Sequence, residues 1–176
     1  AEHQVPNVWR WPEIAVLFCL AVCGFGFVRL TAGLWMVRSF RQNSKPTTDA
    51  GLLELSDVIC AELSCRHSVE LLEAELYSAP ATVGCWRPVI LLPVTWRSWT
   101  EQERRAVLAH EISHIRNGDF LTYAIAQFGL MLHFYNPLVH WLARRLRLEQ
   151  ELMADASAAA FAGGRMEYLQ MLATMA

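Results

Sequence analysis

The chain has 176 residues, of which 54% are hydrophobic and 18% are charged, and its formal net charge is −2. Soluble domains carry roughly 45–50% apolar and about 25% charged residues, so this composition excludes intrinsic disorder and indicates contact with a lipid bilayer. The small net charge provides no basic field, and we expect no direct nucleic-acid binding. The five cysteines form no CxxC pattern and are expected to be reduced packing residues.

The most apolar stretch, residues 14–37, is predicted to be a transmembrane helix. Its 24 residues contain one charge, Arg29. As a helix it would extend about 36 Å, against about 30 Å of bilayer hydrocarbon. A span from about residue 11 to residue 31 places Arg29 near one end, where its side chain can reach the headgroups. A signal peptide and a buried core helix are the alternatives.

The flanks of this stretch indicate its orientation. Tryptophans suited to the membrane interfaces are Trp9, Trp11 and Trp35. Basic residues are more frequent after the stretch, at Arg38, Arg41 and Lys45, than before it, at Arg10. The positive-inside rule therefore places the C-terminal side of the stretch in the cytoplasm. We divide the chain into an N-terminal flank (1–13), a transmembrane helix (14–37), a linker (38–48) and a domain (49–176) that is expected to be truncated at its C-terminus.

After the linker, one helix and two short strands are expected. Asp49 can cap a helix that ends near Cys65. Strands are expected at residues 69–76 and 88–92, with a turn at Gly84. The second strand either pairs with an extended substrate or lies in the core.

Turn and cap residues divide the remainder into four helices. Their expected ranges are 100–117, 119–134, 137–161 and one that begins after Gly163-Gly164. The first begins with a capping box. In this motif the Thr100 hydroxyl accepts a hydrogen bond from a backbone amide of the first turn, and the Glu103 side chain reaches back to the Thr100 amide. Asn136-Pro137 is the strongest break, because Asn is a good N-cap and Pro suits the first helical position.

The first of these helices contains the pattern His-Glu-Ile-Ser-His at residues 110–114. Residues four apart share a helix face, so the imidazoles of His110 and His114 can bind one ion. Glu111 is rotated by about 100° around the helix axis from His110. Zinc lowers the pKa of a bound water towards about 7, and the Glu111 carboxylate can then take a proton from this water. The alternative is a solvated polar face, but the neighbouring residues are apolar, and buried polar groups need partners. The spacing therefore predicts a site for one Zn²⁺ ion.

A catalytic zinc requires a third protein ligand and one open position. Downstream candidates are Asp119, His133, His140, Glu149, Glu151 and Asp155. Glu151 and Asp155 share a helix face, so Glu151 can bind the ion while Asp155 accepts a hydrogen bond from a ligand histidine. Ordinary surface acids are the alternative. Asp119 either makes a similar contact or caps its helix. His133 and His140 are expected to be packing or interface histidines, with polarisation of a substrate carbonyl as the alternative for His140.

The lengths of the helices predict an apolar hairpin. If residues 120–143 crossed the bilayer once, Glu151 would lie about 36 Å from His114, too far for one ion to bridge. The chain must therefore turn back at residues 135–137, and the 16 residues before that break extend only about 24 Å, too short for an ordinary span. The predicted fold is α+β and mostly helical, with a transmembrane helix and a zincin-like HExxH domain that contains a small sheet and this apolar helical hairpin.

Four strings, in this order, resemble the BlaR/MecR-type regulatory membrane metallopeptidases: RPVILLP, LAHEISHIRNGD, NPLVHWLARR and EQELMADASAAA. The resemblance covers about residues 50–165. It implies a gluzincin, in which HExxH is joined by a downstream glutamate. His110, His114 and Glu151 match the zinc ligands of that family. Glu111 matches the catalytic base, and Asp155 matches the carboxylate that comes after the third ligand.

The resemblance implies a zinc endopeptidase in a bacterial-type cytoplasmic membrane, multi-pass in its full length, with its active site facing the cytoplasm. Its expected partners are the lipid bilayer and a protein substrate cleaved in signal transduction, either a transcriptional regulator or the protein itself. HEISHIRNGD and ELMAD also resemble HtpX-type and CAAX-protease-type peptidases, in which the insertion between the motifs is usually longer. A quality-control protease of the HtpX type and a non-catalytic zinc-binding scaffold are therefore the alternatives.

Overall fold

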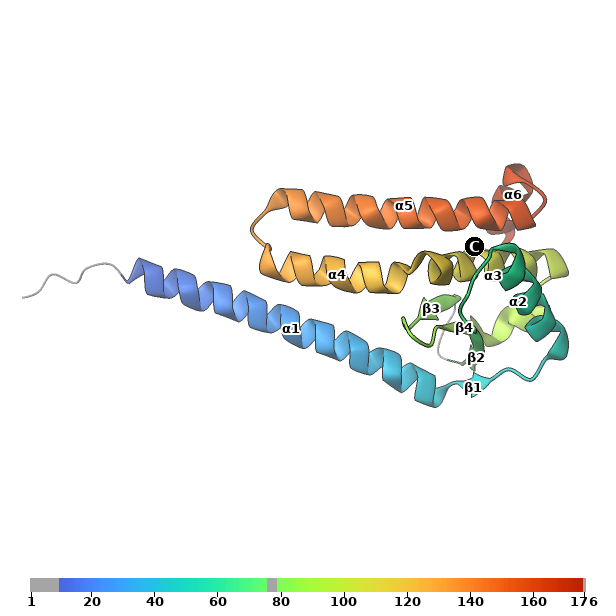
Figure 1. Cartoon of the computed structure of the whole chain (residues 1–176), viewed down its shortest axis with the longest axis horizontal. Helices are drawn as coiled ribbons and strands as arrows, with labels where there is room; N and C mark the ends of the chain where they lie inside the picture. The colour runs from blue at the N-terminus through green and yellow to red at the C-terminus, as the bar shows by residue number, and fades with distance from the viewer. Residues whose placement is uncertain (1–9, 76–78, 176) are drawn as a thin grey trace, which may run out of the picture.

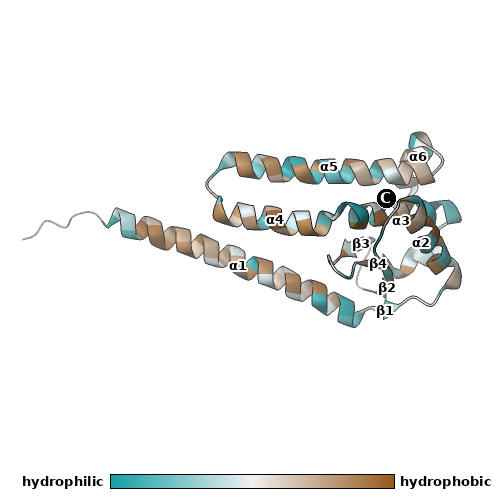
Figure 2. Ribbon diagram, in the orientation of Figure 1, coloured by the Kyte–Doolittle hydropathy of each residue, from teal (hydrophilic) through white to brown (hydrophobic). Residues whose placement is uncertain are grey.

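The computed structural model describes residues 10–75 and 79–175, and it begins with one long apolar helix, α1 (Trp11–Asn43). No residue of α1 is buried, and its most apolar window has a mean hydropathy of 2.2. Its length and composition are sufficient to cross a membrane, and its exposure argues against a buried core helix. Hydrophobic residues occur along most of its length (Figure 2). Trp9 lies outside the described residues.

A small mixed sheet comes next, with the order β1-β2-β4-β3. Its strands are β1 (Lys45–Pro46), β2 (Glu70–Ala74), β3 (Ala81–Val83) and β4 (Val89–Pro93). β2 and β4 are parallel, whereas β1 and β3 are antiparallel to their neighbours. β1 occupies part of the expected linker, and β1 and β3 were not predicted. Strands of two and three residues are too short for an alternating pattern and form only through tertiary pairing.

β4 is buried at all five positions and has a strand on each side. The core interpretation of this segment is therefore correct, and its edges are not free to bind a substrate strand. β3 lies at one edge of the sheet instead. The turn between β3 and β4 contains Gly84 at φ +91°, a conformation that glycine adopts without strain. The predicted strand at 69–76 is shorter than expected, and Leu76 lies outside the described residues.

Helix α2 (Ala50–Glu62) is capped by Asp49, whose Oδ1 accepts from the Leu52 amide at 2.8 Å. It ends before Cys65 because the chain enters the left-handed region at Ser64, with φ +55°. Together with β2, β4 and the short 3-10 helix η1 (Val94–Ser98), α2 covers one face of α3 (Glu101–Asn117). The shared core consists of Leu52, Ile59, Leu71, Ile90, Leu92, Trp96, Leu108, Ala109, Ile112 and Ile115.

Both ends of α3 match their predicted signals. The Thr100 hydroxyl accepts from the Glu103 amide, and the Glu103 carboxylate accepts from the Thr100 amide at 2.6 Å. Gly118 ends the helix at φ +69°. Since only one residue separates the two helices, α4 (Asp119–Leu132) begins immediately afterwards.

The predicted hairpin is confirmed by α4 and α5 (Pro137–Phe161), which run side by side in opposite directions (Figure 1). The turn is fixed by Asn136, whose side chain accepts from the Leu138 amide at 2.9 Å. His140 Nε2 lies 2.7 Å from the Phe134 carbonyl oxygen and closes the same turn. The first half of α5 packs on α4, and its second half packs on α3. The last helix, α6 (Arg165–Met175), begins after Gly163-Gly164 as expected.

Small residues bring α5 close to α3. Ala106 of α3 and Ala158 of α5 are both fully buried in one cluster, and Ala154 is also inaccessible to solvent. The Ser113 and Ser157 hydroxyl oxygens lie 3.2 Å apart across this interface. Because the two backbones approach so closely, the side chains of Glu151 and Asp155, which come earlier in α5, lie within reach of the His-Glu-Ile-Ser-His segment of α3.

Candidate metal centre

Three potential metal ligands converge where α3 meets α5. His110 and His114 lie one turn apart on α3, and Glu151 projects from α5. Their ligand atoms all lie within 4.8 Å of one another. The two Nε2 atoms are 3.2 Å apart, and His110 Nε2 is 3.7 Å from Glu151 Oε2. The hairpin thus brings Glu151 to two histidines that are 37 and 41 positions earlier in the sequence.

The donor atoms and their spacing fit zinc. Two zinc–nitrogen bonds of about 2.0–2.1 Å at a tetrahedral angle separate their nitrogens by about 3.3 Å, close to the 3.2 Å between the two Nε2 atoms. Two imidazoles and one carboxylate are also a common set for a catalytic zinc, which leaves its fourth position open. The geometry therefore provides a three-ligand site for one ion.

Each histidine has a carboxylate beside its other ring nitrogen. His114 Nδ1 lies 2.7 Å from Asp119 Oδ2, and both side chains are largely buried. His110 Nδ1 lies 3.2 Å from Asp155 Oδ1, but it is not aligned for a hydrogen bond and has no such partner among the described residues. A carboxylate on Nδ1 favours the tautomer with its proton there, so that the Nε2 lone pair faces the ion. With both protons on Nδ1, the two Nε2 lone pairs face each other 3.2 Å apart, an arrangement that a cation between them stabilises; with a proton on one Nε2, the same separation is that of an N–H···N hydrogen bond.

Tyr168 of α6 extends this network. Its hydroxyl donates to Asp155 Oδ1 at 2.8 Å. Burial, followed by the hydrogen bond to Asp155, raises the pKa of the Tyr168 phenol well above its ordinary value. The phenol therefore stays protonated and remains a donor. No pattern in the sequence identified this residue, because α6 reaches the site only through the Gly163-Gly164 turn.

Glu111 is 7% exposed and faces the sheet as well as the cluster. The Thr82 hydroxyl of β3 lies 2.7 Å from Glu111 Oε2 and 3.2 Å from the Glu111 carbonyl oxygen. Since the carboxylate can only accept when ionised, Thr82 donates and orients it. Thr82 carries no sequence signal, because it lies on an unpredicted strand.

A cavity of about 450 Å³ opens over the cluster. Its lining includes the three potential ligands, Glu111, Ala81 and Thr82 of β3, and the preceding Pro80. The other candidates for a ligand lie elsewhere. His133 ends α4 and contacts the Tyr135 ring, His140 closes the hairpin turn, and Glu149 pairs with Arg145. His140 is therefore not placed to polarise a carbonyl at the cluster.

The fold combines one helix that is long and apolar enough to cross a membrane with a His-His-Glu cluster that could hold a metal ion. The chain belongs to the BlaR1 peptidase M56 family, whose model matches residues 1–175. It is 27% identical over 119 residues to the regulatory protein BlaR1 of Bacillus licheniformis, covering 68% of this chain and 20% of that relative.

Two further relatives represent both types expected from the sequence. Regulatory protein BlaR1 of Staphylococcus aureus is 27% identical over 100 residues, covering 56% of this chain and 17% of the relative. Protease HtpX of Aeromonas salmonicida is 32% identical over 124 residues, covering 64% of this chain and 42% of that relative. The predicted resemblance to BlaR-type proteins, with HtpX second, is confirmed. The chain spans about a fifth of the length of the BlaR1 relatives and less than half of the length of this HtpX relative.

Proposed function

We propose that this chain is the catalytic part of a membrane-bound zinc endopeptidase of the gluzincin type. The observation that carries the proposal is the convergence of His110, His114 and Glu151 beside the buried Glu111. These three side chains would hold the ion, and Asp119 and Asp155 would orient the two imidazoles. A bound zinc ion supplies a Lewis acid for the substrate carbonyl and lowers the pKa of water.

The protein's own chemistry centres on Glu111. Its carboxylate accepts a proton from the attacking water and transfers it to the leaving amine nitrogen, which completes hydrolysis of the peptide bond. The Thr82 hydroxyl holds Oε2 in place, so the other carboxylate oxygen is available for the proton. The burial of Glu111 excludes bulk water from this transfer.

We assign β3 as the substrate-binding strand. It is an edge strand, and its residues Ala81 and Thr82, with the preceding Pro80, form part of the cavity wall. An extended peptide that pairs with the edge of β3 opposite β4 would place a backbone carbonyl next to the cluster. Such pairing uses main-chain groups and therefore suits a protein substrate of little side-chain selectivity at this strand.

The regulatory relatives favour a role in signal transduction, with a transcriptional regulator or the protein itself as substrate. The basic residues after the apolar part of α1, Arg38, Arg41 and Lys45, support an active site on the cytoplasmic side of a bacterial-type membrane. The relatives named protease HtpX support a second candidate, a protease of membrane quality control. Broad cleavage of unfolded proteins would favour that candidate, and cleavage of one regulator would favour the first.

The experiment that tests the proposal compares wild type with Glu111→Gln, and uses Glu101→Gln, an exposed glutamate on the same helix, as the matched control. Each purified protein is loaded with zinc and incubated with a proteome-derived peptide library, and new termini are identified by mass spectrometry. We expect cleavage by wild type and the control. Glu111→Gln should retain zinc and lose cleavage by at least about a hundredfold. Equal cleavage by Glu111→Gln would remove the role assigned to Glu111.

A further inference from the structure

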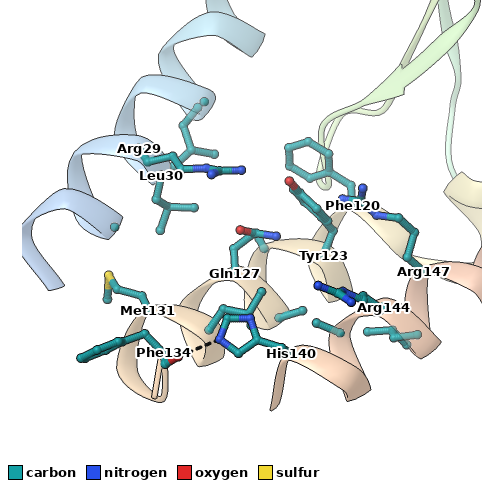
Figure 3. Close-up of a pocket in the computed structure, with 18 of the residues that line it drawn as sticks. Arg29, Leu30, Phe120, Tyr123, Gln127, Met131, Phe134, His140, Arg144 and Arg147 are labelled. Atoms are coloured by element: carbon teal, nitrogen blue, oxygen red, sulfur yellow. Dashed lines mark hydrogen bonds between the residues drawn. The ribbon is translucent and has the colours of Figure 1, made fainter. Parts of the chain in front are cut away.

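A second cavity, of about 710 Å³, lies between α1 and the hairpin of α4 and α5. Three arginines extend towards it (Figure 3): Arg29 comes from α1, and Arg144 and Arg147 come from α5. The rest of the lining is mostly apolar. Charged groups are costly in such surroundings unless a counter-charge is present.

Among the described residues, Arg29 and Arg144 lack that counter-charge, whereas Arg147 also lines the metal cleft, which Asp119 and Glu151 line as well. No carboxylate lies among the described residues that line the cavity between α1 and the hairpin. Neither Arg29 nor Arg144 forms an ion pair or hydrogen bond within the described ranges, and Arg147 lies over the Tyr123 ring at 5.0 Å. The neighbouring Arg145, which does not line the cavity, pairs instead with Glu149. The cavity is therefore complementary to an anion.

The depth of the arginines identifies the kind of anion. Gly26 of α1 lies against Met131 of α4. Arg29 is three residues beyond Gly26, and Met131 is three residues before the turn, so Arg29 lies about 9 Å from the hairpin tip along the helix axes. Arg144 and Arg147 are seven and ten residues into α5, or about 10 and 15 Å from the tip. One leaflet contributes about 15 Å of hydrocarbon. When the tip reaches the bilayer midplane, the arginines therefore lie in the outer part of one leaflet, from where their long side chains extend to the headgroups.

The walls between the arginines and the tip are hydrocarbon-like. They include Val22 and Phe25 of α1 and Leu130 and Phe134 of the hairpin. An amphiphile with an anionic head and an apolar tail matches this order of surfaces, whereas an inorganic anion would leave the apolar walls uncovered.

We propose that this cavity binds one anionic phospholipid, with its phosphate at Arg29, Arg144 and Arg147 and an acyl chain along the apolar walls. Guanidinium groups bind phosphate oxygens in bidentate geometry. The site adjoins the metal cleft, because Tyr123 and Arg147 line both cavities. The proposal concerns binding alone and does not depend on peptidase activity.

The test is native mass spectrometry of the purified chain in a neutral detergent, titrated with phosphatidylglycerol or phosphatidylcholine that carry identical acyl chains. The variants are Arg29→Gln/Arg144→Gln and, as the matched control, Arg145→Gln. We expect wild type to prefer phosphatidylglycerol. The double variant should bind it roughly thirtyfold more weakly, since each arginine contributes about fivefold, and the control should stay within about twofold of wild type. The single variant Arg29→Gln, with an expected loss of about fivefold, provides the same test with less perturbation of the fold.

Competition experiments distinguish the other occupants. Millimolar inorganic phosphate and a soluble glutamate-rich peptide are added separately to the lipid-bound protein. Retention of the lipid supports the proposal. Displacement by phosphate would show a simple anion site, and displacement by the peptide would show a peptide groove; either result contradicts the proposal. So would equal binding of the two lipids by wild type, or full phosphatidylglycerol binding by the double variant.

Discussion

Replacing Asp119 with Asn should weaken zinc binding although Asp119 does not touch the proposed ion. Its Oδ2 lies 2.7 Å from His114 Nδ1, and the Asp119 and His114 side chains are 13% and 16% exposed. Removing a buried carboxylate behind a ligand histidine typically costs about 10–100-fold in metal affinity. This corresponds to about 1.4–2.7 kcal/mol. The first turn of α4 tolerates Asn, so the fold should be retained.

Replacing Asp155, the carboxylate beside His110, with Asn should weaken zinc binding less than Asp119→Asn does. Asp155 lies 3.2 Å from His110 Nδ1 without hydrogen-bond alignment, and its side chain is 46% exposed. Solvent screens this contact, so Asp155→Asn should weaken zinc binding by less than about tenfold. Glu149→Gln is the control, because Glu149 pairs with Arg145 away from the cluster.

The assay is a competition titration against a chromogenic zinc chelator, with the thermal unfolding of each metal-free protein as the measure of fold. An Asp119→Asn protein that binds zinc as tightly as wild type would contradict the supporting role of this carboxylate. A larger loss for Asp155→Asn than for Asp119→Asn would show that hydrogen-bond geometry does not decide the contribution of each carboxylate.

Three further predictions concern the groups that support the cluster. Thr82→Val should lower kcat by about fivefold to tenfold with zinc content unchanged, because one hydrogen bond to Glu111 is lost; unchanged peptide cleavage would contradict this. Ala158→Leu should destabilise the protein by about 1–3 kcal/mol and weaken zinc binding, because the fully buried site has no room for the added side chain. Urea unfolding monitored by circular dichroism measures this cost, and an unchanged midpoint would exclude tight α3–α5 packing. Tyr168→Phe should cost about 1 kcal/mol in the same assay through the lost bond to Asp155, and equal stability would mean that this bond contributes nothing.

The hairpin and the cluster could be predicted because their signals are local and their geometry is restrictive. Asn136-Pro137 is the one strong break in the sequence after α4 begins and before Gly163-Gly164, and an ion shared by His114 and Glu151 requires the chain to return there. Helix ends with caps, such as Thr100 and Gly118, were also predicted closely. In each case, physical constraints within a few residues determine the structure.

The remainder depends on tertiary contacts that no local pattern records. β1 and β3 exist only because β2 and β4 offer them hydrogen bonds. Thr82 and Tyr168 therefore join the site from segments that carry no motif. The cavity between α1 and the hairpin arises likewise from helix packing, including the close approach of Gly26 to Met131.

The proposed zinc site requires the hairpin to return Glu151 to the two histidines of α3. Elemental analysis after dialysis without chelator measures this directly, on wild type, Glu151→Ala and the control Glu149→Ala. We expect close to one zinc ion per chain in wild type and the control, and a marked loss in Glu151→Ala. No zinc in wild type even after its addition, or full zinc in Glu151→Ala, would contradict the assignment of Glu151 as the third ligand of a zinc site.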